Sequence, residues 1–285
     1  MFRYFVLLSC FFSLFNSVLN SKSFLWEVKS DKNTVYILGS VHLADSTLYP
    51  LNPIINEAFD KSKFLVLEID ITNINPYEVL KYTTLPDTLT LSGVVDKETF
   101  SKFKQLFKKH NVPESAFQKL KPWFAVMTLQ SLEMIEGNYS AEYGIDMHFL
   151  DIATNKNLKI KELESLEFQM KVLDTLNQFT GKFLDFTLDE LDKTAQNVDS
   201  ILIAWKNGDT GQMSKIINEG SDSDEFQNVM QFINYSRNIN MVKKIEDYLN
   251  QDEVHFIIVG AAHLIDDKGI IALLNSKNKY TINQK

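Results

Sequence analysis

The sequence predicts an α/β (α+β) protein in which the N- and C-terminal parts build a central mixed sheet around a large helical insertion. One observation is a sequence motif that occurs twice, at residues 35–43 and 256–264. In each copy an apolar run is followed by glycine and, three residues later, by histidine. Such a run, broken by glycine, indicates a strand. The other observation is that stretches with helical periodicity fill most of the chain between the two copies. We therefore expect α/β halves at about 23–95 and 251–285 around a helical middle at 96–250.

The N-terminal half is expected to begin with a β-hairpin. Apolar runs at 24–29 and 34–38 flank the turn-forming segment from Ser30 to Asn33, which is the pattern of two paired strands. A short helix is predicted over 53–61. The continuous apolar run at 64–69 then predicts a strand that is buried on both faces.

The middle of the chain is expected to be mostly helical. Pro122 suits the first turn of a helix whose next residues are apolar on nearly all sides, so this helix should be buried. The segment 158–163 alternates between apolar and polar residues and predicts a strand. The other expected elements are helices at about 141–153, 166–180, 187–206, 224–250 and 270–274, and a last strand at 280–282.

Residues 1–22 have the pattern of a secretory signal peptide, followed by one domain over 23–285. Arg3 precedes an apolar stretch that is too short for a comfortable membrane span, and small and polar residues follow it. The protein is therefore expected to be secreted or periplasmic. The alternative is a membrane anchor, if the N-terminal segment stays uncleaved. Because Cys10 is the only cysteine, the mature chain would have no disulfide and no cysteine metal ligand.

The overall charge bears on the class of partner. The formal net charge is -8, whereas proteins that bind nucleic acid usually carry a basic surface. A nucleic-acid partner is therefore not expected. The expected partner is a peptide or small-molecule substrate, and a membrane becomes a partner only if the N-terminal segment is retained.

Two histidines and a glutamate are expected to share one edge of the sheet. His42 and His263 follow the two repeated strands, and Glu68 lies near the carboxyl end of the strand at 64–69. Ligands collect at the carboxyl ends of parallel strands, and a buried carboxylate is costly unless it is paired or binds a metal. Two neutral imidazoles and a carboxylate are a common ligand set for a divalent transition metal such as manganese, cobalt or zinc. The alternative is that both histidines are ordinary loop residues and that Glu68 caps a nearby element.

Arg237 interrupts the apolar stripe of the helix predicted over 224–250. A guanidinium cannot lose its proton, so a buried one needs an anionic partner. That partner is a structural carboxylate, a substrate carboxylate or the oxyanion of a tetrahedral intermediate. Asn238 beside it would be a further hydrogen-bond donor. The stripe itself consists of apolar residues three and four positions apart, namely Phe226, Met230, Ile233, Met241, Ile245 and Tyr248.

Asp146 and Glu164 are two further candidate acids. Asp146 lies roughly 60° from the centre of the apolar face of its predicted helix, so it should point inward. Glu164 follows the alternating strand, where it is a fourth metal ligand, a supporting acid, or simply a carboxylate at the start of a helix. Two other histidines need no function: His110 ends a lysine-rich stretch, a normal place for a cation at a helix C-terminus, and His255 opens a strand.

Six short motifs together resemble the TraB/GumN family, which includes the Tiki-type metalloproteases. The resemblance covers about residues 24–274. It implies an α/β core whose active-site elements are the paired G-x-x-H motifs and a glutamate, and it implies metal-dependent peptide hydrolysis for the Tiki branch. For bacterial members it implies less, because inhibition of peptide pheromone signalling, from which the TraB name comes, is compatible with binding alone. The motifs, in chain order, are Gly39-Ser40-Val41-His42, Leu67-Glu68, Gly144-Ile145-Asp146, Leu163-Glu164-Ser165 with Gln169 behind it, Arg237-Asn238 and Gly260-Ala261-Ala262-His263.

The first functional hypothesis is a secreted or periplasmic metal-dependent hydrolase, with a peptidase as the expected type. His42, Glu68 and His263 would hold or surround the metal, with Glu68 alternatively acting as the base. Asp146 or Glu164 would complete the ligand shell or act as general base, and Arg237 would stabilise the developing oxyanion. The second hypothesis is a non-catalytic extracytoplasmic protein that binds a peptide or small ligand in the same pocket. A third is a metal-independent esterase in which a histidine activates water.

Overall fold

The computed structural model of the chain describes residues 22–178, 182–219 and 224–285, and its centre is one six-stranded sheet. Residues 1–21 of the signal peptide predicted over 1–22 lie outside the described residues. Within the described ranges, no helix is both long and apolar enough to span a membrane. The strands are β1 (Leu25–Lys29), β2 (Thr34–Ser40), β3 (Phe64–Leu67), β4 (Lys159–Glu162), β5 (His255–Gly260) and β6 (Thr281–Gln284).

The sheet is mixed, and its parallel part joins the two ends of the chain. The strand order is β4-β3-β5-β2-β1-β6. β4, β3, β5 and β2 are parallel neighbours, whereas β1 runs antiparallel to both β2 and β6. β5 from the C-terminal part lies between β3 and β2, so neither end of the chain completes the sheet alone. The predicted α/β class and the mixed central sheet are confirmed.

Helices occupy most of the chain between β3 and β5. Those between the two strands are α2 (Pro76–Thr83), α3 (Leu91–Val94), α4 (Lys97–Lys109), α5 (Glu114–Phe117), α6 (Pro122–Glu136), α7 (Ile145–Asn155), α8 (Leu166–Asp174), α9 (Lys182–Asp189), α10 (Thr194–Lys206), α11 (Thr210–Ile217), α12 (Asp224–Met230) and α13 (Ser236–Leu249). α1 (Pro53–Asp60) precedes β3, and α14 (Ile270–Asn275) follows β5. Pro122 stands in the first turn of α6, as predicted. Side-chain oxygens cap the first turns of other helices. At the start of α1, for example, the Asn52 side chain accepts a hydrogen bond from Ile54 N–H.

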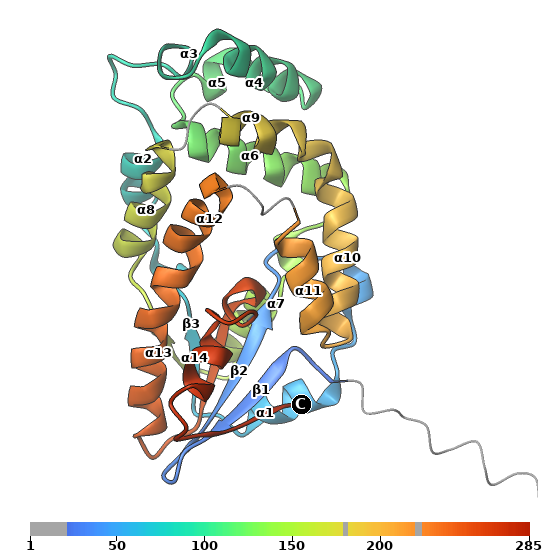
Figure 1. Cartoon of the computed structure of the whole chain (residues 1–285), viewed down its shortest axis with the longest axis vertical. Helices are drawn as coiled ribbons and strands as arrows, with labels where there is room; N and C mark the ends of the chain where they lie inside the picture. Colours follow the sequence, from blue (N-terminus) through green and yellow to red (C-terminus); the bar gives the residue numbers. More distant parts are fainter. Residues whose placement is uncertain (1–21, 179–181, 220–223) are drawn as a thin grey trace, which may run out of the picture.

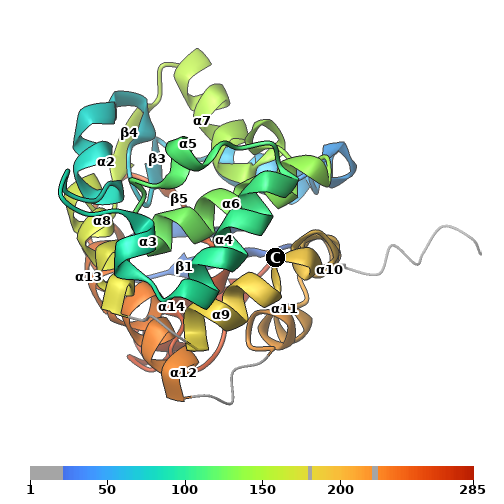
Figure 2. The ribbon, with the colours of Figure 1, turned by 90° about the horizontal axis from the view of Figure 1, so that it is seen from above.

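Helices pack on both faces of the sheet. On one face, Phe59 of α1 and Phe149 of α7 both contact Phe256 of β5, with ring centroids 5.3 and 5.1 Å from it. On the other face, Tyr248 of α13 stacks on His255, the neighbouring residue of β5, at 4.3 Å. Successive residues of a strand point to opposite faces, so α7 and α13 must lie on opposite sides of the sheet, as Figure 2 shows.

A second hydrophobic core lies away from the sheet. It is built from α3–α6 and α9, with Phe103, Phe107 and Phe117 as its largest fully buried side chains. Phe107 and Phe117 stack with their ring centroids 4.2 Å apart. Figure 1 shows these helices as a layer above the sheet, so this part of the helical middle has a core of its own.

Two of the predicted long helices are interrupted in the structure. The helix expected over 224–250 consists of α12, a π-helical segment at Gln231–Tyr235 and α13. The π segment arises because Ser236 N–H bonds to Gln231 C=O, five residues back. The helix expected over 187–206 begins as α9 and continues, after a 3-10 turn, as α10. Apolar periodicity does not detect such single-turn changes, because the apolar face continues through them.

His255 shows how the start of β5 is held. Its ring is fully buried and stacks between Phe64 and Tyr248, at 4.7 and 4.3 Å. Lys161 Nζ lies 2.9 Å from Nε2, and Nδ1 lies 2.7 Å from the carbonyl of Glu253. An ammonium group only donates, so Nε2 accepts from Lys161 and Nδ1–H donates to Glu253. Burial, together with the charge of Lys161, lowers the pKa of His255 to about 4.

His255 should therefore make the protein less stable in mild acid. The folded protein keeps this histidine neutral down to about pH 4, whereas the unfolded chain protonates it below about pH 6.5. Stability is thus lost as the pH falls between these values, by at most about 1.4 kcal/mol per pH unit. Urea unfolding of the wild type and of His255→Gln should show a stability difference that narrows across this window. Parallel stability curves for the two proteins would contradict the prediction.

Candidate active site

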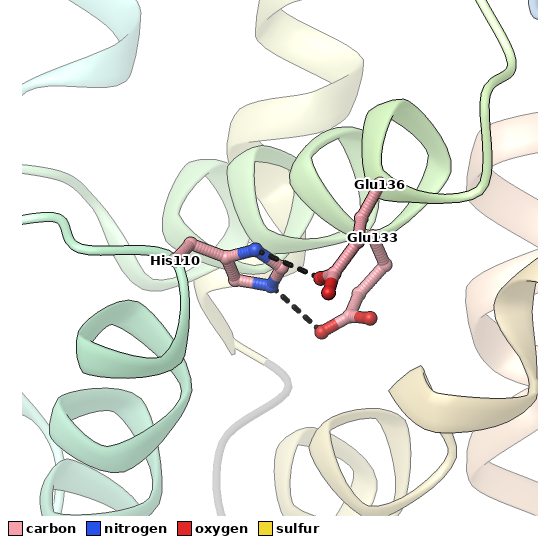
Figure 3. Close-up of side chains that lie close together, drawn as sticks. All are labelled: His110, Glu133 and Glu136. Atoms are coloured by element: carbon pink, nitrogen blue, oxygen red, sulfur yellow. Dashed lines mark hydrogen bonds and ion pairs between the residues drawn. The ribbon is translucent and has the colours of Figure 1, made fainter.

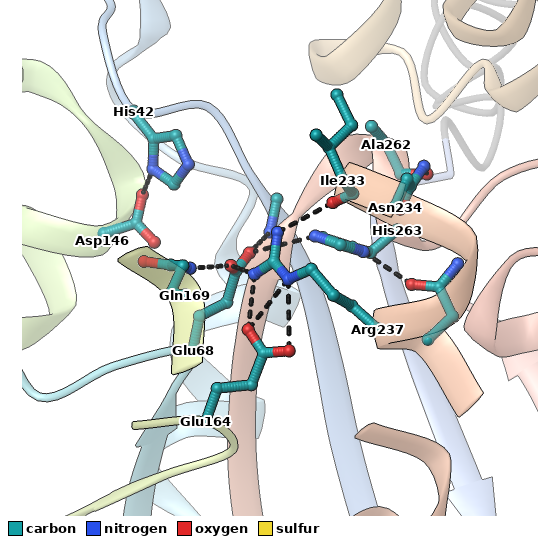
Figure 4. Close-up of polar contacts among 12 residues, drawn as sticks. His42, Glu68, Asp146, Glu164, Gln169, Ile233, Asn234, Arg237, Ala262 and His263 are labelled. Carbon is teal, nitrogen blue, oxygen red and sulfur yellow. Dashed lines mark hydrogen bonds and ion pairs between the residues drawn. The ribbon is translucent and has the colours of Figure 1, made fainter. Parts of the chain in front are cut away.

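Four parallel strands deliver polar residues to one edge of the sheet. Along this edge, in sheet order, Glu164 follows β4, Glu68 follows β3, His263 follows β5 and His42 follows β2. The two glycine-histidine motifs lie side by side because Ser40 pairs with Gly260 in the parallel ladder. Figure 4 shows the side chains converging.

Glu68 is the centre of the hydrogen-bond network. Its Oε1 accepts from Gly260 N–H at 2.7 Å, and its Oε2 accepts from Gln169 Nε2 at 3.0 Å and from Arg237 Nη2 at 2.5 Å. Burial alone would raise the pKa of this carboxyl. The charge of His263 in the acid range where that ring is protonated, the charge of Arg237 and the Gly260 N–H outweigh burial and lower the pKa of Glu68 to about 2. Glu68 is therefore a fixed carboxylate.

Arg237 joins two carboxylates. Its Nε donates to Glu164 at 2.9 Å, and its Nη2 donates to both Glu164, at 2.6 Å, and Glu68. The Arg237 and Glu164 side chains are only 8% and 2% exposed. Nη1 of Arg237 donates to the carbonyl of Ile233, in the π-helical segment. Of the partners considered for Arg237, the structure shows carboxylates of the protein itself.

His42 is held at Nδ1 by Asp146. The ring nitrogen lies 2.7 Å from Asp146 Oδ2, at the start of α7. Gly144 allows this approach, since a Cβ there would lie 2.3 Å from the carbonyl oxygen of His42. The hydrogen bond to Asp146 raises the pKa of His42 to about 9. The His42 side chain is 68% exposed, so it forms the solvent side of the site.

His263 is held at Nδ1 by Asn238. The two atoms are 2.6 Å apart, and both residues are buried. Nε2 of His263 points toward Glu68, 3.6 Å from Oε1. Burial lowers the pKa of His263 to about 4, with Arg237 acting in the same direction. The two repeated motifs therefore place their histidines in different surroundings: one is exposed beside a carboxylate, and the other is buried beside an amide.

The space in front of Gly260 has the donors that a divalent metal requires. A Cβ on this glycine would stand 3.4 Å from Glu68 Oε1, 3.7 Å from His263 Cδ2 and 3.9 Å from His42 Nε2. Metal-binding histidines usually have their other ring nitrogen held by a carboxylate or carbonyl oxygen, and both histidines here meet that condition. The separation of 3.6 Å between His263 Nε2 and Glu68 Oε1 is close to the ~3.4 Å expected for two ligands of one tetrahedral metal ion. His263 and Glu68 therefore fit two ligand positions of one metal ion, whereas the ligand atoms of His42, Glu68 and His263 do not all lie within 4.8 Å of one another.

A second possible metal-binding group lies in the helical layer. Figure 3 shows His110, at the end of α4, facing Glu133 and Glu136 of α6. Among the described residues, this is the group of three whose ligand atoms all lie within 4.8 Å of one another. Nε2 of His110 lies 2.7 Å from Glu133 and Nδ1 lies 3.4 Å from Glu136, while Lys109 Nζ lies 2.8 Å from both Glu133 oxygens. These side chains already neutralise one another. A metal ion bound by Glu133 would therefore have to displace Lys109.

The structure brings together all the candidate residues named from the sequence. Glu164 contacts Arg237, and Asp146 contacts His42. The sequence interpretation assigned no function to His110 and did not detect its group with Glu133 and Glu136. One available signal was Glu133 itself, an acid on a helix that is apolar on nearly all sides and a residue only 8% exposed in the structure.

The fold and the site define the class of this protein. It is a mixed α/β protein with two histidines and an arginine-bound carboxylate at the carboxyl edge of its parallel strands. The sequence pattern of the TraB/PrgY/gumN family matches residues 24–284. The chain belongs to the TraB/PrgY/gumN family, which confirms the resemblance noted from its motifs.

Curated relatives are distant. Protein YbaP of Escherichia coli K12, described as uncharacterized, is 23% identical over 172 residues, which is 60% of this chain and 64% of that protein. The YbaP protein of Shigella flexneri matches to the same extent. The chain therefore spans less than two thirds of the length of these relatives. No solved structure shows a significant match to the chain.

Removing the arginine should destabilise the fold. In Arg237→Met, the buried carboxylates Glu68 and Glu164 lose their shared cation, and breaking a buried ion pair in this way costs about 3–5 kcal/mol. Urea unfolding at neutral pH should show this loss. The double variant Arg237→Met/Glu164→Gln removes one of the unpaired charges and should recover part of the stability. A loss below about 1 kcal/mol in the single variant would mean that the ion pair contributes little.

Proposed function

We propose that this protein is a metal-dependent hydrolase that acts on peptides outside the cytoplasm, with its metal held by His42, Glu68 and His263. The observation that carries the proposal is the pair of atoms at the buried end of the site. Nε2 of His263 and Oε1 of Glu68 face each other at 3.6 Å, which is too long for a hydrogen bond. A cation between them would satisfy both, and His42 Nε2 faces the same space.

The protein's own residues prepare this site. Arg237 and Gln169 occupy Oε2 of Glu68, while Oε1, besides accepting from Gly260, faces His263. This arrangement favours Glu68 as a metal ligand. Asp146 orients His42, and Glu164 holds Arg237 in place. A bound divalent ion such as manganese, cobalt or zinc would activate a water molecule and polarise the substrate carbonyl.

The substrate class and the location rest on other support. Peptides are proposed because the motifs resemble those of the Tiki-type metalloproteases as well as of the wider family. Export is proposed because residues 1–22 have the charge and apolar pattern of a signal peptide. The sequence contains no G-x-S-x-G motif that would suggest a serine nucleophile.

The metal can be located by comparing matched variants of the two candidate groups. Elemental analysis of protein reconstituted with manganese, cobalt or zinc should find about one equivalent in the wild type. The His42→Ala/His263→Ala variant should lose this metal, whereas His110→Ala/Glu136→Gln should retain it. Cleavage of a peptide library should fall at least about 100-fold with Glu68→Gln. Circular dichroism should show that each variant is folded.

Other outcomes point to different functions. Loss of metal only in the His110→Ala/Glu136→Gln variant would move the metal to the helical layer and overturn the proposed site. Saturable peptide binding without cleavage, with affinity unchanged in Glu68→Gln, would support a binding protein instead. Full hydrolysis after exhaustive chelation would support a metal-independent reaction.

A further inference from the structure

We infer that Asn238 is a positioning residue that holds His263 in the tautomer with the proton on Nδ1 and the lone pair on Nε2. The inference concerns the protein without metal. It rests on the proposed function only in one respect, namely that the free Nε2 lone pair serves a metal ion.

The orientation of the Asn238 amide is determined by its second contact. Asn238 is fully buried, and its Nδ2 lies 2.9 Å from the carbonyl oxygen of Lys268. Only the NH₂ group can donate to a carbonyl, so Oδ1 is the atom that faces His263. Oδ1 lies 2.6 Å from Nδ1 of His263. An amide oxygen only accepts, so Nδ1 must carry the proton.

The other ring nitrogen, Nε2, faces a carboxylate oxygen that can only accept a hydrogen bond, as Nε2 itself can in this tautomer. With the proton on Nδ1, a neutral imidazole has a lone pair on Nε2. That lone pair faces the carboxylate oxygen of Glu68 at 3.6 Å. Free neutral histidine favours the opposite tautomer, in which Nε2–H would be directed at Glu68. Asn238 therefore opposes the tautomer that the carboxylate alone would favour, and keeps Nε2 available as a ligand.

An amide achieves this without adding charge. At His42 the corresponding acceptor is the carboxylate of Asp146, on the exposed side of the site. At His263 the site already contains Glu68 and Glu164 with one arginine between them. A third buried carboxylate beside His263 would be costly, whereas asparagine supplies the acceptor as a neutral group.

Asn234 provides a matched control on the same helical stretch. It lies in the π-helical segment, one turn before Asn238, and its Nδ2 donates to the carbonyl of Ala262 at 2.9 Å. Both asparagines thus bind the backbone around His263, but Asn238 also contacts its ring. A purely structural role predicts similar effects of the two substitutions, whereas a positioning role predicts a change of tautomer only at Asn238.

The tautomer can be measured directly by nitrogen NMR. Long-range proton–nitrogen spectra of metal-free, ¹⁵N-histidine-labelled protein at neutral pH report which ring nitrogen is protonated. The His263 signals are identified by their absence in His263→Gln. We expect a protonated Nδ1 and an unprotonated Nε2 in the wild type and in Asn234→Ala, and a shift toward Nε2–H in Asn238→Leu.

Cobalt titration then tests the consequence for metal binding. Cobalt affinity should fall about 10–100-fold in Asn238→Leu, the range for loss of a group that orients a histidine ligand, and should remain close to wild type in Asn234→Ala. A wild type that binds no cobalt but shows the expected tautomer would refute the proposed function and leave the role of Asn238 intact. Protonated Nε2 in the metal-free wild type, alone or together with Nδ1, would overturn the inference. An unchanged tautomer in folded Asn238→Leu would also overturn it.

Discussion

The ion pair that joins Arg237 to Glu68 and Glu164 is the interaction on which the candidate site depends. It ties α13 to the segments that follow β3 and β4, and it places three charges where little water reaches them. Burying either carboxylate without the arginine would be unfavourable, because an unpaired buried charge costs roughly several kcal/mol. Arg237 is the only arginine after Arg3 in the sequence. Its planar fork contacts two carboxylates at once, which the single ammonium of a lysine does less well.

The direction of the strands is the second constraint. β4, β3, β5 and β2 run parallel, so the residues that follow them meet at one edge although they come from distant parts of the chain. The pairing of Ser40 with Gly260 aligns the two glycine-histidine motifs. Gly260 contributes both its N–H, which binds Glu68, and its missing side chain, whose place Glu68, His263 and His42 surround.

The two histidines show that one sequence motif can serve two chemical environments. His42 is exposed and bonded to a carboxylate, so protonation is favoured; His263 is buried and bonded to an amide, so the neutral ring is favoured. The difference arises from the helices rather than from the strands. α7 supplies Asp146 to one motif, and α13 supplies Asn238 to the other.

The sequence by itself determined the sheet strands, the position of the histidines and glutamate at strand ends, and the need of Arg237 for an anionic partner. These follow from local patterns, since apolar runs, glycine breaks and a charge within an apolar stripe can be read over a few residues. Only the tertiary structure decided the partners. Arg237 meets Glu164 across 73 positions and Glu68 across 169, and Asn238, expected as a donor, both donates to Lys268 and accepts from His263. The π-helical turn could not be predicted, and Glu133 in its apolar helix did not by itself reveal the contact with His110. Both depend on how helices pack against one another and not on the periodicity of any one segment.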